Sequence, residues 1–207
     1  MKNNKKALEI ISKMKPYLIS NKVFNLNIEH FIKKQNISLE DFYTYFPESI
    51  NSMSITYFEN ITFLAIKNCK KTVFNEKSIS RKITQILKQN ILIISKEKEL
   101  SQFFIRYLTT KPRLLLIISN HFAHSAWREI KDNSTDFNYY TKRIILSKIY
   151  LVSLYYWKKT LNISDTNLLI ERQISSIKIL AKIKDFREKL FNKIIKNDFL
   201  KYLDFKH

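Results

Sequence analysis

The 207-residue chain fits one domain with a substantial core, and it carries a net charge of +19 with no glycine and one cysteine. The absence of glycine excludes P-loops, Rossmann fingerprints and GxSxG serine sites, because those turns need backbone angles that a Cβ atom forbids. The lone Cys69 excludes an internal disulfide and is typical of a reducing compartment.

The first part of the chain reads as three short helices. Apolar residues at three- and four-residue spacings predict a helix from Lys5 to Ile19, which Pro16 is expected to end or kink. A second helix is predicted from Asn27 to Lys34. The run Ser38-Leu39-Glu40-Asp41 resembles a capping box and begins a third helix, which ends near Phe46-Pro47. Helices of these lengths resemble the N-terminal helix-turn-helix of the TetR-type repressor fold.

The helical patterns lengthen after this head, and short polar breaks separate them. The predicted helices are Ile55 to Phe74, Ser80 to Ile94, Lys98 to Thr109, Pro112 to Lys131, Phe137 to Lys159 and Ser164 to about Phe205. The helix after the break at 133–136 is expected to begin within Ser134-Thr135-Asp136, since all three are good N-cap residues. The longest charge-free apolar run, Leu114 to Trp127, is too short to span a bilayer.

These patterns predict an all-α, TetR-like chain. We expect a helix-turn-helix head over residues 1–50, a larger helical ligand-binding body over 51–185 and a basic amphipathic helix over 186–207, all within one compact unit.

The positive charge does not lie where a DNA-binding head needs it. Residues 35–66, which include the third short helix, contain no Lys or Arg, and the helix itself carries Glu40 and Asp41. Duplex binding depends on phosphate neutralisation, and base edges are read chiefly by Arg, Lys, Asn and Gln. We therefore expect no nucleic-acid partner. A TetR-type transcription regulator with an apolar ligand pocket is the alternative interpretation.

Side chains that could carry chemistry are sparse. His121 and His124 share a helix face, but no further ligand lies one turn away, so they are interpreted as hydrogen-bonding histidines with no metal. The chain also lacks paired carboxylates with apolar flanks. The sequence therefore predicts no catalytic residues, no cofactor and no enzyme activity.

Large apolar side chains gather on consecutive predicted helices. The set is Phe103, Phe104, Tyr107, Leu115, Ile118, Phe122, Ile145, Ile149, Val152 and Tyr156. One interpretation is an ordinary core, and the other is the wall of an apolar pocket for lipid.

The C-terminal segment combines an apolar stripe with lysines. The stripe consists of Phe191, Ile194, Ile195, Phe199 and Leu203. Such a helix can lie in a membrane interface, or it can pack back on the body; both interpretations stay open.

Four features around the break at 133–136 carry a family resemblance. They are Trp127, the run Ser134-Thr135-Asp136-Phe137-Asn138-x-Tyr140-Thr141-Lys142-Arg143, the triplet Tyr155-Tyr156-Trp157 and Ile170-x-Arg172-x-Ile174. Together with the head they resemble the ninth coenzyme Q biosynthesis protein family, lipid-binding accessory proteins of ubiquinone synthesis. The resemblance covers roughly Lys5 to Lys182.

The resemblance implies a TetR-like fold without DNA binding, an apolar pocket for an isoprenoid quinone or a phospholipid, and a homodimer. It also implies a partner, the di-iron demethoxyubiquinone hydroxylase or another enzyme of ubiquinone synthesis. By motif, the partner-binding residues are Asp136, Tyr139, Tyr140 and Arg143, with Trp127 on the facing helix. Spacing places Asp136, Tyr140 and Arg143 on one face.

This sequence departs from the family at two places. Tyr139 stands where the family usually has tryptophan, and Asp132 or Asn133 where it usually has glycine, so one of these two is expected in a left-handed turn.

The resulting hypothesis is a non-enzymatic protein that presents polyprenylated quinone intermediates to a membrane-associated hydroxylase. The absence of a transit segment favours a bacterial member, peripheral to the cytoplasmic face of the inner membrane. A third interpretation is a basic helical protein that associates with membrane surfaces or RNA and has no pocket.

Overall fold

The computed structural model describes residues 2–20, 28–132 and 135–177, and the regular structure in these ranges is entirely helical. The all-α prediction is confirmed, and the order of short and long helices is consistent with a TetR-like fold. The labelled helices are α1 (Lys2–Ser20), α2 (Ile28–Lys34), α3 (Leu39–Tyr45), α4 (Ile50–Asn75), α5 (Ile79–Lys96), α6 (Lys98–Thr109), α7 (Pro112–Glu129) and α8 (Asp136–Thr160). A further helix covers 163–177.

The chain divides into a first compact unit over residues 1–170 and a second over 171–207, of which 171–177 are described and helical. In the described ranges, no helix has the length and apolar character needed to cross a membrane. The predicted membrane-contact residues lie outside the described residues: Phe191, Ile194, Ile195, Phe199 and Leu203.

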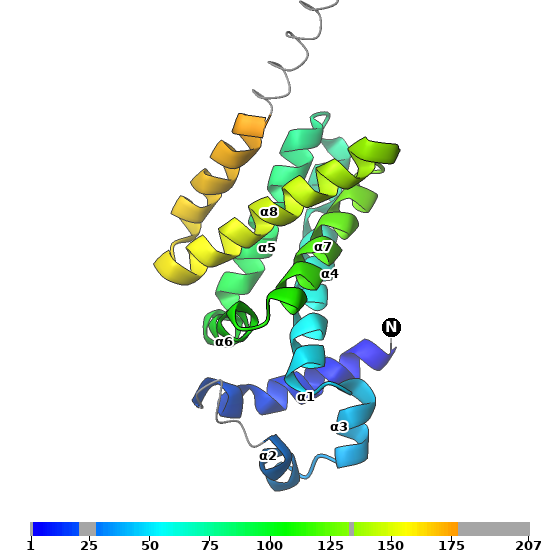
Figure 1. The fold of residues 1–207 in the computed structure, drawn as a ribbon, viewed down its shortest axis with the longest axis vertical. Coiled ribbons are helices and arrows are strands. Elements are labelled where there is room, and N and C mark those ends of the chain that lie inside the picture. The colour runs from blue at the N-terminus through cyan, green and yellow to red at the C-terminus, as the bar shows by residue number, and fades with distance from the viewer. Residues whose placement is uncertain (1, 21–27, 133–134, 178–207) are drawn as a thin grey trace, which may run out of the picture. The chain divides into compact units, whose positions relative to one another are not determined.

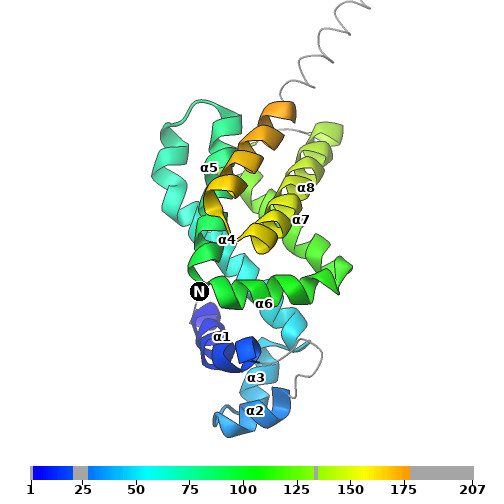
Figure 2. The same cartoon turned by 90° about the vertical axis from the view of Figure 1, so that its left-hand side faces the viewer.

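Helices α1 to α3 pack at one end of the first unit, and α4 runs from them into the larger bundle (Figures 1 and 2). Their core is formed by fully buried apolar side chains of all three helices, including Met14, Ile32 and Phe42. As expected, Ser38 caps α3, because its Oγ accepts a hydrogen bond from the backbone N–H of Asp41 at 3.4 Å. The exposed residues of α3 include both of its acids.

Two helix ends differ from the prediction. Pro16 does not end α1, which continues to Ser20. Leu18, two residues later, is fully buried. Its packing holds the last turn in the helix although proline has no backbone N–H to donate. Helix α4 begins at Ile50 instead of Ile55, because Ile50 and Met53 already pack into the core.

The bundle is organised around α4. Helix α4 packs against α5 over the longest stretch and also against α7, while α8 lies on α7 and contacts α5 and α6. Figure 1 shows α8 crossing in front of α5, and the contacts between them agree with that view. Helix α6 contacts α1, so the small N-terminal group and the bundle share one continuous core.

Candidate functional site

Helix α7 ends in a tight turn at residues 130–132. The N–H of Asp132 donates to the carbonyl of Trp127, and the N–H of Lys131 donates to the carbonyl of Arg128, each at 3.1 Å. This pair of bonds is the Schellman motif, in which the residue after the helix adopts a left-handed conformation that glycine normally supplies. Here Lys131 takes that conformation, with φ of 58°.

The expected position of the left-handed residue was therefore wrong for Asp132. That residue has no positive φ, because the turn needs its reversal one position earlier, at Lys131. Asn133 lies outside the described residues.

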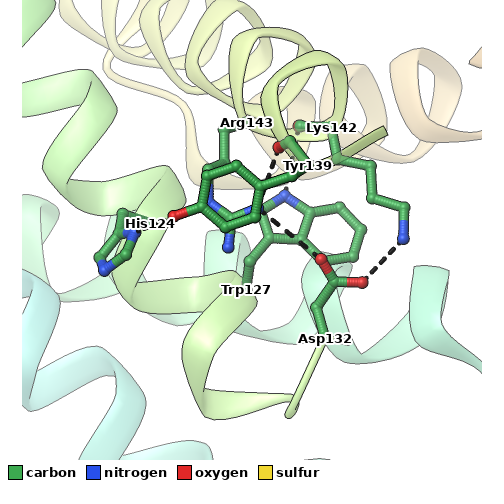
Figure 3. Close-up of polar contacts among 6 residues, drawn as sticks. All are labelled: His124, Trp127, Asp132, Tyr139, Lys142 and Arg143. Atoms are coloured by element: carbon green, nitrogen blue, oxygen red, sulfur yellow. Dashed lines mark hydrogen bonds and ion pairs between the residues drawn. The ribbon is translucent and has the colours of Figure 1, made fainter. Parts of the chain in front are cut away.

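The turn aims the carboxylate of Asp132 at the first turns of α8. One oxygen accepts a hydrogen bond from Lys142 Nζ at 2.7 Å, and the other lies 3.7 Å from a guanidinium nitrogen of Arg143. Only 5% of the Asp132 side chain is exposed. Two cations thus neutralise a buried carboxylate, which fixes the start of α8 to the end of α7 (Figure 3).

Arg143 is held flat against Tyr139. Its guanidinium carbon lies 3.3 Å from the centre of the tyrosine ring, and one of its nitrogens donates to the Tyr139 carbonyl at 2.9 Å. This is a cation–π arrangement, which a tyrosine supports as a tryptophan would. Only 13% of the Arg143 side chain is exposed, so its guanidinium interacts mainly with Asp132 and Tyr139 and little with solvent.

Trp127 closes the cluster from α7. Its indole N–H donates to the carbonyl of Lys142 at 3.2 Å, and the Lys142 ammonium lies 5.1 Å from the indole ring centre. The side chain is 9% exposed. We call the six residues drawn in Figure 3 the junction cluster: His124, Trp127, Asp132, Tyr139, Lys142 and Arg143.

The two histidines of α7 point to different partners. The Tyr139 hydroxyl lies 3.5 Å from His124 Nδ1, and His121 pairs with Glu59 of α4 at 3.8 Å. Loss of some hydration around the imidazole lowers the pKa of His124, and the charge of Arg143 lowers it further. In the described part of the chain, no group of three or more His, Cys, Asp or Glu side chains could hold a metal ion.

Residues 119–181 match the family model described as COQ9. The match covers less than a third of the chain, so the likeness to COQ9 is a likeness of this segment. The matched segment contains the entire junction cluster and all of α8. Neither the curated proteins nor the solved structures gave a match.

The partner-binding residues predicted in the COQ9 segment have unequal access to solvent. Tyr140 is 65% exposed and touches Tyr139 edge to face, with ring centres 5.2 Å apart. Trp127 and Arg143 are largely covered within the junction cluster. The side chain of Asp136 lies outside the described residues. Tyr140 is thus the predicted partner residue that a second protein reaches most easily.

Most of the ten predicted pocket residues lie in the interior. Five are buried: Phe103, Phe104, Ile118, Phe122 and Ile149. Four are partly buried: Tyr107, Leu115, Ile145 and Tyr156.

Val152 is the exception, because it is 39% exposed. The buried face of α8 is turned by about one position from the predicted one. Its inward residues are Leu146, Ser147, Ile149, Tyr150, Ser153, Leu154 and Trp157. Val152 lies beside that face and not on it, so it cannot line an interior pocket in this conformation.

A surface groove of about 460 Å³ lies between α4 and α7. Phe63 and Ile66 form an apolar part of its wall, and its charged lining is mixed: Lys67, Lys70, Arg128, Glu59 and Glu129. None of the ten predicted pocket residues lines it. The groove is therefore distinct from the predicted lipid site.

The sequence prediction missed Asp132 and Lys142 as members of the junction cluster. The signal that could have found them is an acid at the helix-ending turn followed, ten residues later in the next helix, by the doublet Lys142-Arg143. Opposite charges at the two sides of one turn are free to pair across it.

Proposed function

We propose that this protein belongs to the COQ9 family and is a non-enzymatic accessory protein that takes polyprenylated quinone intermediates from a membrane surface. It presents them to a di-iron demethoxyubiquinone hydroxylase or to another enzyme of ubiquinone biosynthesis. The observation that carries the proposal is that the COQ9 match covers the junction cluster and α8 together. This segment joins an ordered surface turn to the apolar interior of the bundle.

The interior supports the lipid part of the proposal. Phe103, Phe104 and Phe122 are buried on α6 and α7, which lie next to the buried face of α8. Burial of a lipid tail is favourable by about 0.8 kcal/mol per methylene group, so even partial enclosure competes with a bilayer. An all-helical body can admit a tail by small separations of its helices.

The junction cluster supports the partner part of the proposal. Tyr140 and Ile144 are 65% and 66% exposed, and their four-residue spacing places them on one face of α8. In the same turns of α8, Lys142 and Arg143 are held by ion pairs with Asp132. An exposed aromatic on a rigid support is a favourable docking residue, because little conformational freedom is lost on binding.

The lipid part is tested by mass spectrometry of an organic extract from the purified full chain. We expect an isoprenoid quinone, or a precursor of one, at a substantial molar fraction of the protein. An extract without isoprenoid lipid, from protein purified without detergent, would contradict the proposal.

The TetR-type regulator remains the competing interpretation, and the head argues against it. The solvent side of α3 presents Glu40 and Asp41, and Asp41 pairs with Lys6 of α1 at 3.3 Å. An acidic face repels the phosphate backbone of DNA. A gel shift with the upstream region of its own gene at moderate salt distinguishes the two functions, and a specific shift would favour the regulator.

A further inference from the structure

The hairpin formed by α4 and α5 exposes two large apolar side chains beside its loop. Phe74, in the last turn of α4, is 80% exposed, and Ile79, which begins α5, is 54% exposed. The core of the hairpin does not need them, because the neighbouring Val73 and Ile83 are already buried there. Single exposed apolar residues are common, so the charges around these two decide what they indicate.

The chain around this loop is strongly basic. Residues 67–82 contain six Lys or Arg and a single acid, Glu76, whereas residues 35–66 contain no Lys or Arg at all. Among the described residues, no ion pair joins any of the five lysines of 67–82 to an acid. The positive charge is therefore concentrated at one place and is open to an outside partner.

Glu76 does not offset this charge at the surface. Its side chain is only 19% exposed, and its carboxylate accepts a hydrogen bond from the backbone N–H of Ser78 at 2.9 Å. The other carboxylate oxygen lies 3.8 Å from a guanidinium nitrogen of Arg81. These contacts hold a loop of three residues, 76–78, between the two helices. The loop thus has its own internal support and presents mainly lysines to solvent.

The lysines lie on the same helix faces as the exposed apolar residues. Lys70 and Lys71 precede Phe74 by one turn of α4, and Lys82 follows Ile79 by one turn of α5. We define the hairpin tip as these residues and the exposed loop lysine: Lys70, Lys71, Phe74, Lys77, Ile79 and Lys82.

The hairpin tip lies at the end of the bundle that also holds the start of α8, opposite α1 to α3 (Figures 1 and 2). The surface groove agrees with this arrangement, because Ile66 and Lys70 of α4 line it together with Arg128 and Glu129 of α7. A molecule bound at the hairpin tip is therefore at the same end of the bundle as the junction cluster.

We propose that the hairpin tip binds the surface of an anionic lipid bilayer. Phe74 and Ile79 enter the head-group region, and the lysines contact the lipid phosphates while their aliphatic stems lie along the apolar side chains. The inference rests on the proposed function and deepens it, because it names a surface of the described bundle that faces the membrane. This surface is separate from the C-terminal segment.

The apolar residues favour a bilayer over a nucleic acid. A duplex offers phosphates to the lysines but no apolar layer for Ile79 to enter. Single strands bind through several aromatic side chains on which successive bases stack, and the hairpin tip has one, Phe74. A bilayer interface takes an aromatic and an aliphatic side chain equally well when cations surround them.

The first test places a fluorescent reporter at the hairpin tip of the full chain. Phe74→Trp keeps an aromatic side chain, and the natural Trp127 and Trp157 are 9% and 1% exposed, so the wild-type protein supplies a steady background. The vesicles contain equal amounts of phosphatidylcholine and phosphatidylglycerol. We expect the added emission to move to shorter wavelength on these vesicles and to be quenched by brominated acyl chains.

Phe63→Trp is the matched control on the same helix. Phe63 is 55% exposed but lies eleven residues before Phe74, which is about 16 Å along the helix axis. This reporter should show neither the shift nor the quenching. Vesicles of phosphatidylcholine alone should bind the wild-type chain at least tenfold more weakly, because they carry no net negative charge.

The second test removes charge and measures vesicle binding by cosedimentation. Lys70→Gln/Lys71→Gln should weaken binding to the anionic vesicles at least tenfold. Lys33→Gln/Lys34→Gln, at the end of α2, removes the same charge from another exposed lysine pair and should change binding less than twofold. All four lysines are exposed, so the melting temperatures should stay at the wild-type value.

Four outcomes would overturn the inference. Vesicle binding without quenching of the Phe74→Trp reporter would place the membrane contact elsewhere and leave the proposed function standing. Equal losses in the two lysine variants would show an effect of net charge alone. Polyuridylate binding that is lost in Lys70→Gln/Lys71→Gln, without quenching of the reporter, would assign the hairpin tip to nucleic acid. Failure of the wild-type chain to bind anionic vesicles would also contradict the membrane part of the proposed function.

Discussion

At the scale of single residues, Asp132 holds the α7–α8 turn together. Its buried carboxylate faces Lys142 and Arg143, so Asp132→Asn leaves both cations without their counter-charge. We expect a loss of about 2 kcal/mol in the free energy of unfolding, measured by urea denaturation. Asp41→Asn is the control, because Asp41 pairs with Lys6 at the surface, with half of its side chain exposed; that loss should be below about 1 kcal/mol. Equal losses in the two variants would contradict the role of Asp132.

Tyr140 is the residue whose replacement should affect partner binding without affecting the stability of the fold. Because 65% of Tyr140 is exposed, Tyr140→Ala should change the melting temperature little while weakening binding to the hydroxylase at least tenfold. Tyr155→Ala is a suitable comparison, since Tyr155 is 61% exposed on the same helix but far from the junction cluster. Surface plasmon resonance with immobilised hydroxylase measures both. A large fall in the stability of Tyr140→Ala would assign this residue to the core.

His124 adds a pH dependence to the same turn. Its pKa is lowered, first by loss of some hydration and then by the nearby Arg143, so the folded state favours the neutral imidazole. The stabilisation is present above the unfolded pKa of about 6.5 and is lost as the pH falls through the lower folded value. His124→Gln should therefore reduce the fall in melting temperature between neutral pH and about pH 5. A variant curve parallel to that of the wild type would refute this.

At the scale of elements, the turn after α7 is strained because the chain has no glycine. Lys131 occupies a left-handed conformation in which a Cβ atom costs about 1 kcal/mol. Lys131→Gly should raise the free energy of unfolding by about that amount, whereas Lys131→Ala should not, because alanine keeps the Cβ atom. Thermal melts of the two variants make the comparison. Identical melting temperatures would show that this conformation carries no strain.

The helices were predictable from sequence to different degrees. The bounds of α6 follow from the polar break before Lys98 and the proline at 112, and the capping residues place the start of α8 within one residue. The inward face of α8 was harder, because both Val152 and Leu154 are apolar and only their packing neighbours decide which turns inward. The spacing of apolar residues predicts the buried face of a helix only to within about one residue. The many aromatic residues of α8 make that prediction less precise.

At the scale of the whole molecule, the all-α class was visible in the sequence, and so was the likeness of residues 119–181 to COQ9, through the run from Ser134 to Arg143. The site was visible only in part. The role of Asp132 could not be assigned without the turn that reverses at Lys131. Such facts depend on contacts between segments that are distant in sequence.

The most direct test of quinone presentation is hydroxylase turnover on liposomes that contain its polyprenylated substrate, with and without this protein. We predict that a stoichiometric amount of the protein increases the rate. Tyr140→Ala should remove this increase, and Tyr155→Ala should preserve it. An unchanged rate with the wild-type chain, or an equal increase with Tyr140→Ala, would contradict presentation through the exposed aromatic beside the junction cluster.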